Sequence, residues 1–164
     1  MWSKKMPSDP SRPRIGLAWA GNPDNKNDRL RSIPLRHFAP LAAISNARFY
    51  TLQLGPAANE IAHPTPGLEL IDFTRDLHDF ADTAAMIANL DLVIAVDTSV
   101  AHLAGALGKP VWILVPFAPD WRWLLQREDS PWYPTMRLFR QKTHGDWADV
   151  IQHVADSLVE LNPG

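Results

Sequence analysis

The chain contains no cysteine, which excludes disulfide bonds and thiolate chemistry and is consistent with a reducing compartment. It has no run of about 20 apolar residues, so a membrane-spanning helix is not expected. Residues 1–13 lack the apolar stretch of a secretory signal. We therefore expect a cytoplasmic protein.

Neither sign of charge dominates, because 16 lysines and arginines stand against 18 aspartates and glutamates. No basic block occurs, which argues against nucleic-acid binding through phosphate neutralisation. The sequence also lacks the G-x-G-x-x-G pattern of dinucleotide sites, the G-x-S-x-G pattern of serine hydrolases and a cluster of metal ligands. Residues 16–21 have the glycine spacing of a P-loop, but Asn22 and Pro23 replace the required Lys-Ser/Thr pair.

What the 164 residues do contain is 46% hydrophobic side chains, enough for the core of one domain. The 15 prolines are scattered through apolar segments, which indicates many sharp ends of helices and strands rather than disorder. Residues 1–13 are polar and lack periodicity, and we interpret them as a linker or N-terminal arm. Residues 14–164 form the predicted domain.

Short apolar runs alternate with helical patterns along this domain. Strands are predicted at residues 14–20, 48–54, 68–73, 91–96, 110–115 and 136–140. Helices are predicted at 35–44, 57–62, 79–89, 98–107 and 146–161, with Asp79 as an N-cap. Such alternation is typical of βαβ units. The predicted fold class is α/β, a three-layer, Rossmann-like parallel sheet.

Ligands of such sheets bind beyond the carboxyl ends of the strands. At one such end, Asp97, Thr98 and Ser99 lead from a strand into a helix, and His102 follows about one turn later. Free N–H groups at Ser99, Val100 and Ala101 and the helix dipole would favour an anion there. The alternative is that Asp97 or Thr98 only caps the helix and that His102 is a packed surface histidine.

Two loops lie at the same predicted edge. Residues 22–32 carry Arg29 and Arg31, whose guanidinium groups suit phosphate oxygens, unless this is simply a solvated polar loop. Residues 117–134 carry Trp121, Trp123 and Trp132, which could stack on a base or sugar ring or could plug the core. If these tryptophans are exposed, the loop should also favour a homodimer.

The run V-D-T-S-V-A-H-L-A-G-A-L-G-K-P-V-W at residues 96–112 resembles the nucleotide-sugar motif of the heptosyltransferases, glycosyltransferase family 9. Together with I-G-L-A-W-A-G-N-P, D-R-L-R-S-I-P-L and A-P-D-W-R-W-L-L, it looks more closely like the glycosyltransferase-like C-terminal half of bacterial tetratricopeptide-repeat proteins. The resemblance spans residues 13–161. It implies the C-terminal half of a B-type (GT-B) glycosyltransferase, the half that holds most of the donor.

The resemblance also implies roles for individual residues. Arg31 and His102 are the expected catalytic residues, with Arg31 on a donor phosphate, and Glu60 is a weaker candidate for the nucleoside ribose. Ser99 and Arg31 stand where the heptosyltransferases usually have Gly and Lys, which argues against an ADP-heptose donor. The expected substrate-binding residues are Gly21, Asn22, Arg31, Ser32, Glu60, Asp97, Thr98, Ser99 and His102.

By this resemblance the chain is the nucleotide-sugar-binding domain of an inverting, metal-independent glycosyltransferase. It would need no cofactor and would be inactive without an N-terminal acceptor domain, which together with a repeat domain is an expected partner. The alternative is a non-catalytic protein-interaction module on the same fold. A third possibility is an unrelated small-molecule-binding domain, whose pocket would lie away from Asp97.

Overall fold

Six parallel strands form one sheet in the part of the chain that the computed structural model describes, residues 2–63 and 65–161. The strands are β1 (Arg14–Ala18), β2 (Arg48–Thr51), β3 (Leu70–Ile71), β4 (Leu92–Val96), β5 (Val111–Val115) and β6 (Met136–Arg140). Their order across the sheet is β3-β2-β1-β4-β5-β6, and each neighbouring pair is parallel. The predicted fold class is therefore confirmed.

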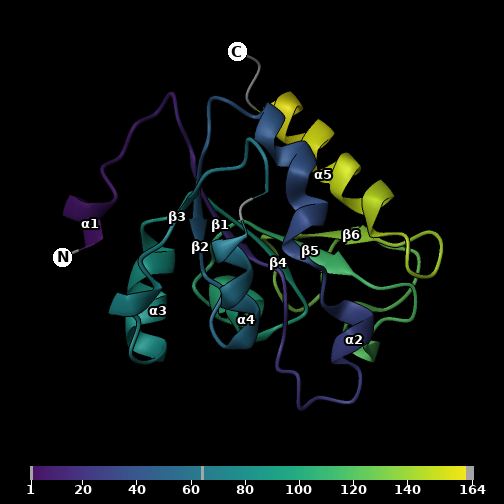
Figure 1. Cartoon of the computed structure of the whole chain (residues 1–164). Coiled ribbons are helices and arrows are strands. Elements are labelled where there is room, and N and C mark those ends of the chain that lie inside the picture. Colours follow the sequence, from purple (N-terminus) through teal and green to yellow (C-terminus); the bar gives the residue numbers. More distant parts are fainter. Residues whose placement is uncertain (1, 64, 162–164) are drawn as a thin grey trace.

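Helices cover both faces of this sheet (Figure 1). One face carries the 3₁₀-helix η1 (Leu35–Ala43) and α5 (Trp147–Leu161), which pack against each other. The opposite face carries α1 (Trp2–Lys5), α3 (Phe80–Ala88) and α4 (Ser99–Ala106). Shorter helical segments lie in the connections: α2 (Asp28–Arg31), η2 (Pro56–Ala62), η3 (Thr74–Asp76) and η4 (Trp121–Trp123).

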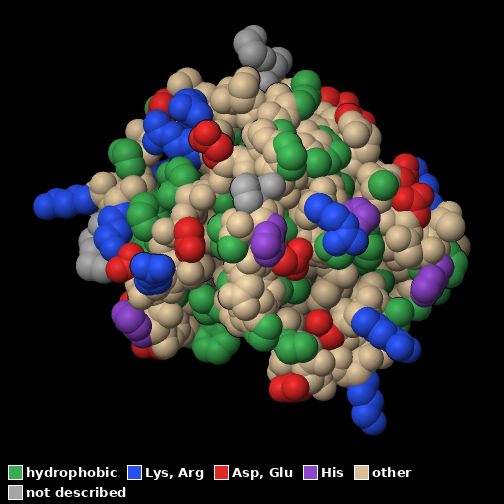
Figure 2. All heavy atoms as spheres, viewed as in Figure 1, with side chains coloured by type: hydrophobic (Ala, Val, Ile, Leu, Met, Phe, Trp, Pro, Cys, Tyr) green, Lys and Arg blue, Asp and Glu red, His purple; other side chains and the backbone are tan. Residues whose placement is uncertain are grey.

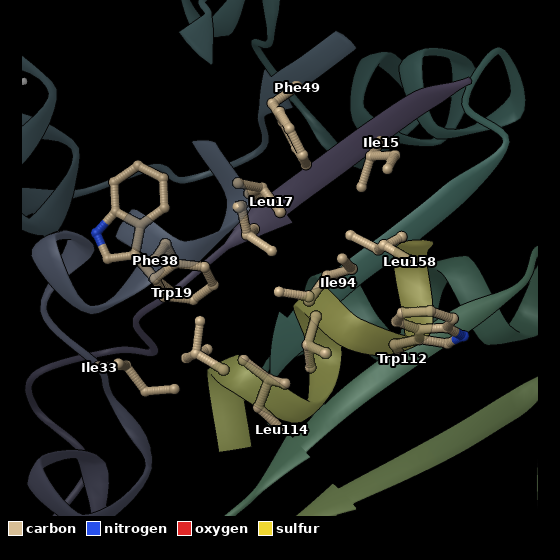
Figure 3. Close-up of a cluster of buried hydrophobic side chains, with 14 of the residues drawn as sticks. Ile15, Leu17, Trp19, Ile33, Phe38, Phe49, Ile94, Trp112, Leu114 and Leu158 are labelled. Atoms are coloured by element: carbon tan, nitrogen blue, oxygen red, sulfur yellow. The ribbon is translucent and has the colours of Figure 1, made fainter. Parts of the chain in front are cut away.

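The core is divided between these two faces because strand side chains alternate in direction. Ile15 and Leu17 of β1 and Ile94 of β4 point toward Phe38 of η1 and Leu158 of α5, as Figure 3 shows. The intervening residues pack against α3 and α4 on the other face. All five residues of both β4 and β5 are buried, as expected for central strands of a parallel sheet.

Most predicted elements occur, but several are shorter than expected. The first strand ends at Ala18 because the next two N–H groups, of Trp19 and Ala20, donate to the side chain of Gln53 at 2.9 and 2.8 Å. The helix predicted at 35–44 is a series of 3₁₀ turns rather than an α-helix. Pro40 lies inside it and cannot donate the α-helical hydrogen bond. The strand predicted at 68–73 is only Leu70–Ile71.

The start of the N-terminal arm packs against the domain. Trp2 and Met6 are buried, and the ring of Trp2 lies edge-on to Phe73 with 6.1 Å between centroids. Lys5 Nζ forms an ion pair with Asp76 Oδ2 at 2.7 Å. Short as it is, α1 therefore contributes to the core beneath α3.

Charges of both signs are scattered over the face of the molecule that Figure 2 shows, without a continuous basic surface there. Within residues 2–63 and 65–161, no helix combines the length and apolarity needed to cross a bilayer.

Candidate functional site

Two adjoining cavities lie at the carboxyl ends of β1, β2 and β4. The strand order reverses between β1 and β4, and ligands of doubly wound sheets bind in the crevice that opens at such a point. The cavities have volumes of about 310 and 500 Å³ and share Asn22, Thr98 and Ser99. We call them the apolar cavity and the polar cavity.

The start of α4 forms the wall between them. Thr98 is the N-cap residue, in an extended conformation and without a side-chain capping bond. In the described part of the chain, the N–H groups of Ser99 and Val100 have no backbone acceptor, so they and the helix dipole remain available to an anion. The expectation for Ala101 was wrong, because its N–H donates to the Thr98 carbonyl at 3.0 Å.

A chain of hydrogen bonds fixes the loop after β1. Gly21 N donates to Ser32 Oγ at 3.0 Å, and Ser32 Oγ donates to Asp28 Oδ2 at 2.8 Å. Asp28 Oδ1 accepts from Arg31 Nε at 3.1 Å, and Arg31 Nη1 donates to the Asp97 carbonyl at 2.7 Å. Gly21 is needed here because a Cβ atom would clash with Asp28 and Arg31. Arg31 thus lines the polar cavity and also ties this loop to the end of β4.

Asp97 and His102 form a second pair of residues that line the polar cavity. His102 Nε2 lies 3.4 Å from Asp97 Oδ1, and His102 Nδ1 lies 3.2 Å from the hydroxyl of Tyr133. The imidazole also stacks on the indole of Trp123, with 5.5 Å between centroids. These contacts hold the ring in one orientation, with about a third of the side chain exposed to the cavity.

The surroundings of Asp97 act on its charge in opposite directions. Burial disfavours the ionised form, but the proximity of the His102 ring and of the Trp123 N–H, with the charges of His102 and Arg31, holds the pKa of Asp97 below its ordinary value. Trp123 Nε1 has no hydrogen-bond partner within the described residues, so it acts as a nearby dipole rather than a formed hydrogen bond. Asp97 therefore remains a carboxylate near neutral pH.

The loop after β5 completes the polar cavity with Asp120 and Arg122, which are paired at 2.7 Å. In this loop Trp121 and Trp132 are 66% and 54% exposed, but Trp123 is only 1% exposed. The two alternatives for this loop therefore divide between its tryptophans: Trp121 and Trp132 are exposed, whereas Trp123 is packed into the core under His102.

The apolar cavity is bounded by the ends of β1 and β2 and by α3. Phe80 and Leu54 are exposed large apolar side chains on its rim, and the backbones of Gly21 and Gly55 pass beside it. Gln53, which pins the end of β1, contributes a polar group to its wall.

The structure brings most of the predicted residues together. Gly21, Asn22, Arg31, Asp97, Thr98, Ser99 and His102 line one or both cavities, and Ser32 supports Gly21. Glu60 lies apart from both cavities: its carboxylate accepts a hydrogen bond from Leu35 N at 2.8 Å at the start of η1. Glu60 therefore caps the start of η1 by accepting the N–H of its first residue.

Sequence reasoning missed five residues that shape the site: Asp28, Gln53, Asp120, Arg122 and Tyr133. A signal existed for Asp28, because Arg31 and Ser32 follow it at the spacing of one helical turn. No local pattern pairs Tyr133 with His102, which is 31 residues away. Among the described residues, no group of three or more His, Asp or Glu side chains is arranged to hold a metal ion.

Comparison with known proteins gives the same picture of the fold. Residues 34–114 match the model of glycosyltransferase family 9 (heptosyltransferase). The curated protein FlbA of Caulobacter vibrioides is 31% identical over 96% of this chain, which corresponds to 27% of FlbA. This chain therefore spans about a quarter of the length of that relative.

Solved structures resemble the chain at low sequence identity. ADP-heptose LPS heptosyltransferase II of E. coli has a TM-score of 0.66 and 17% identity, and the match covers 98% of this chain and 50% of that one. E. coli heptosyltransferase WaaC with ADP has a TM-score of 0.61 and 16% identity, and the match covers 98% of this chain and 47% of that one. A family 9 glycosyltransferase from Veillonella parvula has a TM-score of 0.58 and 12% identity, and the match covers 98% of this chain and 48% of that one. The chain thus has the fold of one half of a GT-B heptosyltransferase, and its residues 34–114 match glycosyltransferase family 9.

Proposed function

We propose that this chain is the donor-binding domain of a family 9 glycosyltransferase and that its ligand is a nucleoside diphosphate sugar. The observation that carries the proposal is the polar cavity. Arg31, Arg122, His102 and the start of α4 face one space of about 500 Å³ at the point where the strand order reverses. Two guanidinium groups and free helical N–H groups are the donors that phosphate oxygens require.

The apolar cavity fits the other end of the same ligand. It adjoins the polar cavity at Thr98 and Ser99, so a diphosphate beside α4 could extend its nucleoside into it. Phe80 offers a ring face and Gln53 a hydrogen-bonding side chain, the combination of apolar walls and few polar groups typical of small-molecule sites. The similar WaaC structure contains ADP, which supports a nucleoside diphosphate here.

The chemistry that follows is stabilisation of the leaving group. As the bond between sugar and phosphate breaks, negative charge grows on the diphosphate. Arg31, Arg122 and Ser99 already line the polar cavity, and Val100 lines the adjoining apolar cavity, so these groups can stabilise that charge with little reorganisation. In the proposed mechanism they replace a divalent metal ion, and transfer inverts the configuration of the sugar, as the resemblance to heptosyltransferases implies.

Transfer to an acceptor needs more than this chain. We propose that the base that deprotonates the acceptor belongs to an N-terminal domain of a longer, cytoplasmic protein with tetratricopeptide repeats. The chain spans about half of the similar heptosyltransferase structures and a quarter of FlbA, which supports a separate acceptor domain. The exposed side chains of the loop after β5 would then lie toward it.

Thermal unfolding in the presence of UDP, ADP, GDP and CMP tests the proposal directly. One of the diphosphates should stabilise the chain by about 2.7 kcal/mol at 100 times its dissociation constant. Arg122→Gln should weaken that binding roughly tenfold, the loss of a charge-assisted hydrogen bond in a partly exposed site.

Arg127→Gln provides a matched control. Arg127 pairs with Asp129 at 2.7 Å in the same loop, just as Arg122 pairs with Asp120, but it lies outside the polar cavity. The Arg127→Gln variant should therefore bind the diphosphate with the affinity of the parent chain. If none of the four nucleotides stabilises the chain, the proposal fails and a non-catalytic interaction module becomes the better interpretation.

A further inference from the structure

Two exposed indole rings form a corner beyond the polar cavity. The planes of Trp121 and Trp132 meet at 87°, with 6.0 Å between ring centroids. With His102, Arg122 and Tyr133 they surround a third cavity of about 190 Å³. We call it the aromatic corner.

The aromatic corner is braced by the chain around it, although its rings are exposed. Trp132 Nε1 donates to the Arg122 carbonyl at 3.0 Å, and the Trp132 and Tyr133 N–H groups both donate to Ser130 Oγ. From beneath the loop, Arg140 donates to the carbonyls of Trp123 and Arg127. Hydrogen bonds therefore orient Trp132, and the guanidinium of Arg122 lies over the ring of Trp121, 5.0 Å from its centroid. Both indoles nevertheless remain more than half exposed.

The corner continues the polar cavity. His102 and Arg122 line both spaces. When the charged part of a ligand lies beside α4, the chemical group bonded to that part therefore reaches the two indoles. In a nucleoside diphosphate sugar with its diphosphate in the polar cavity and its base in the apolar cavity, that group is the sugar.

We infer that the aromatic corner binds the sugar ring of the donor, an inference that rests on the proposed function. The C–H face of a sugar ring packs on the electron-rich face of an indole. Its hydroxyl groups need donors and acceptors, which Arg122 and the hydroxyl of Tyr133 supply in the corner and Asp120 supplies in the adjoining polar cavity. Because the two indole planes are nearly perpendicular, the corner fits one sugar ring, with a face against one indole and an edge against the other.

The size and polarity of the corner favour a sugar over a nucleobase. Its volume of about 190 Å³ lies below the roughly 300 Å³ at which pockets for drug-sized ligands begin, and a base with its ribose needs the larger space. The apolar cavity, at about 310 Å³, provides that space on the other side of Ser99. Trp121 and Trp132 are then specificity-determining residues for the transferred sugar.

Calorimetric titration of the 164-residue chain tests this inference. The ligands are the diphosphate found in the thermal screen and its glucose and N-acetylglucosamine conjugates. The parent chain should bind at least one conjugate more tightly than the diphosphate. Trp121→Ala should lower the affinity for that conjugate about threefold to tenfold, the contribution of one aromatic contact. The affinity for the diphosphate should be unchanged.

Two further variants make the result specific. Trp121→Phe keeps a ring at the same place and should restore part of the affinity for the conjugate. Leu125→Ala removes a side chain that is 74% exposed in the same loop but lies outside the corner, and it should have no effect. Trp121 makes no hydrogen bond with its side chain among the described residues, so Trp121→Ala should fold.

The outcomes separate the two proposals. If the parent chain binds the diphosphate and Trp121→Ala does not change the affinity for the conjugate, only the sugar-binding role of the aromatic corner is overturned. Equal weakening of diphosphate and conjugate binding would also overturn that role, because that result places the nucleoside diphosphate rather than the sugar against Trp121. Absence of diphosphate binding to the parent chain would overturn the proposed function and this inference with it.

Discussion

At the scale of single residues, Arg31 shows how one side chain can serve both the fold and the ligand. Its guanidinium contacts Asp28 through Nε and the Asp97 carbonyl through Nη1, and it still lines the polar cavity. A residue of a purely solvated loop would make neither contact. Replacing it should therefore change stability as well as binding.

We expect Arg31→Ala to weaken diphosphate binding by about 1.5–3 kcal/mol, the range for hydrogen bonds to charged groups, and to lower the free energy of unfolding by about 1–3 kcal/mol, because Asp28 and the Asp97 carbonyl lose their partner. Arg31→Lys should fall between the parent and the alanine variant, since lysine keeps the charge but not the fork of donors. Urea unfolding and calorimetry measure the two effects.

Arg29 in the same short helix supplies the comparison. It is exposed and does not line the polar cavity, so Arg29→Ala should behave as the parent chain in both measurements. Parent-like stability and affinity in Arg31→Ala would return Arg31 to the role of a solvated loop residue.

At the scale of elements, the beginnings of α3 and α4 use different residues for different purposes. Asp79 caps α3 through its side chain, which accepts from Asp82 N at 2.8 Å. Thr98 leaves the first turn of α4 uncapped by a side chain. The N-cap of α3 thus satisfies the N–H group of Asp82, whereas the first turn of α4 leaves the N–H groups of Ser99 and Val100 without a backbone acceptor among the described residues.

Removing the cap of α3 tests this assignment. Asp79→Ala should lower the free energy of unfolding by about 0.5–2 kcal/mol, whereas Asp79→Asn should be nearly neutral because asparagine caps about as well. Since Phe80 and Thr83 of α3 line the apolar cavity, the alanine variant should also bind the nucleotide slightly less well. Equal urea midpoints for the alanine and asparagine variants would contradict the capping role of Asp79.

At the scale of the whole molecule, an ion pair between Arg14 and Asp91 joins the amino ends of β1 and β4. These ends lie on the side of the sheet away from the site, which is at the carboxyl ends of the strands. Asp91 accepts hydrogen bonds from Arg14 N, Nε and Nη2 at 2.8, 3.0 and 2.8 Å. Hydrogen bonding from Arg14 outweighs partial burial and lowers the pKa of Asp91 in the folded state. Since the unfolded value is about 3.9, this contribution to stability is fully present above that pH and is lost as pH falls through the folded value.

Acid unfolding should show this linkage. Asp91→Asn should lower the urea midpoint at pH 7 and pH 5 by the same amount, and the difference from the parent should shrink below about pH 4 as the parent carboxylate becomes protonated. Glu69→Gln, at an exposed carboxylate without an ion pair among the described residues, should stay within about 0.5 kcal/mol of the parent at pH 7. A difference that persists unchanged to pH 2.5 would contradict the role of Asp91.

The sequence by itself determined the fold class, the number of strands and which chain segments follow the carboxyl ends of the strands. The reason is that hydrophobic periodicity, caps and breakers are local. The apolar runs that end before Gly21 and Asp97 identify strand ends, and parallel strands bring those ends to one edge. Asp79 was identified as an N-cap for the same reason.

Only the tertiary structure decided what each side chain does at that edge. Trp121 and Trp123 are two residues apart in an aperiodic loop, yet one is exposed and the other lies buried under His102. Arg31 finds its acceptor 66 residues away, and His102 its partner Tyr133 after 31. Such pairings depend on how separate βαβ units pack against one another, and local spacing carries no information about contacts between units.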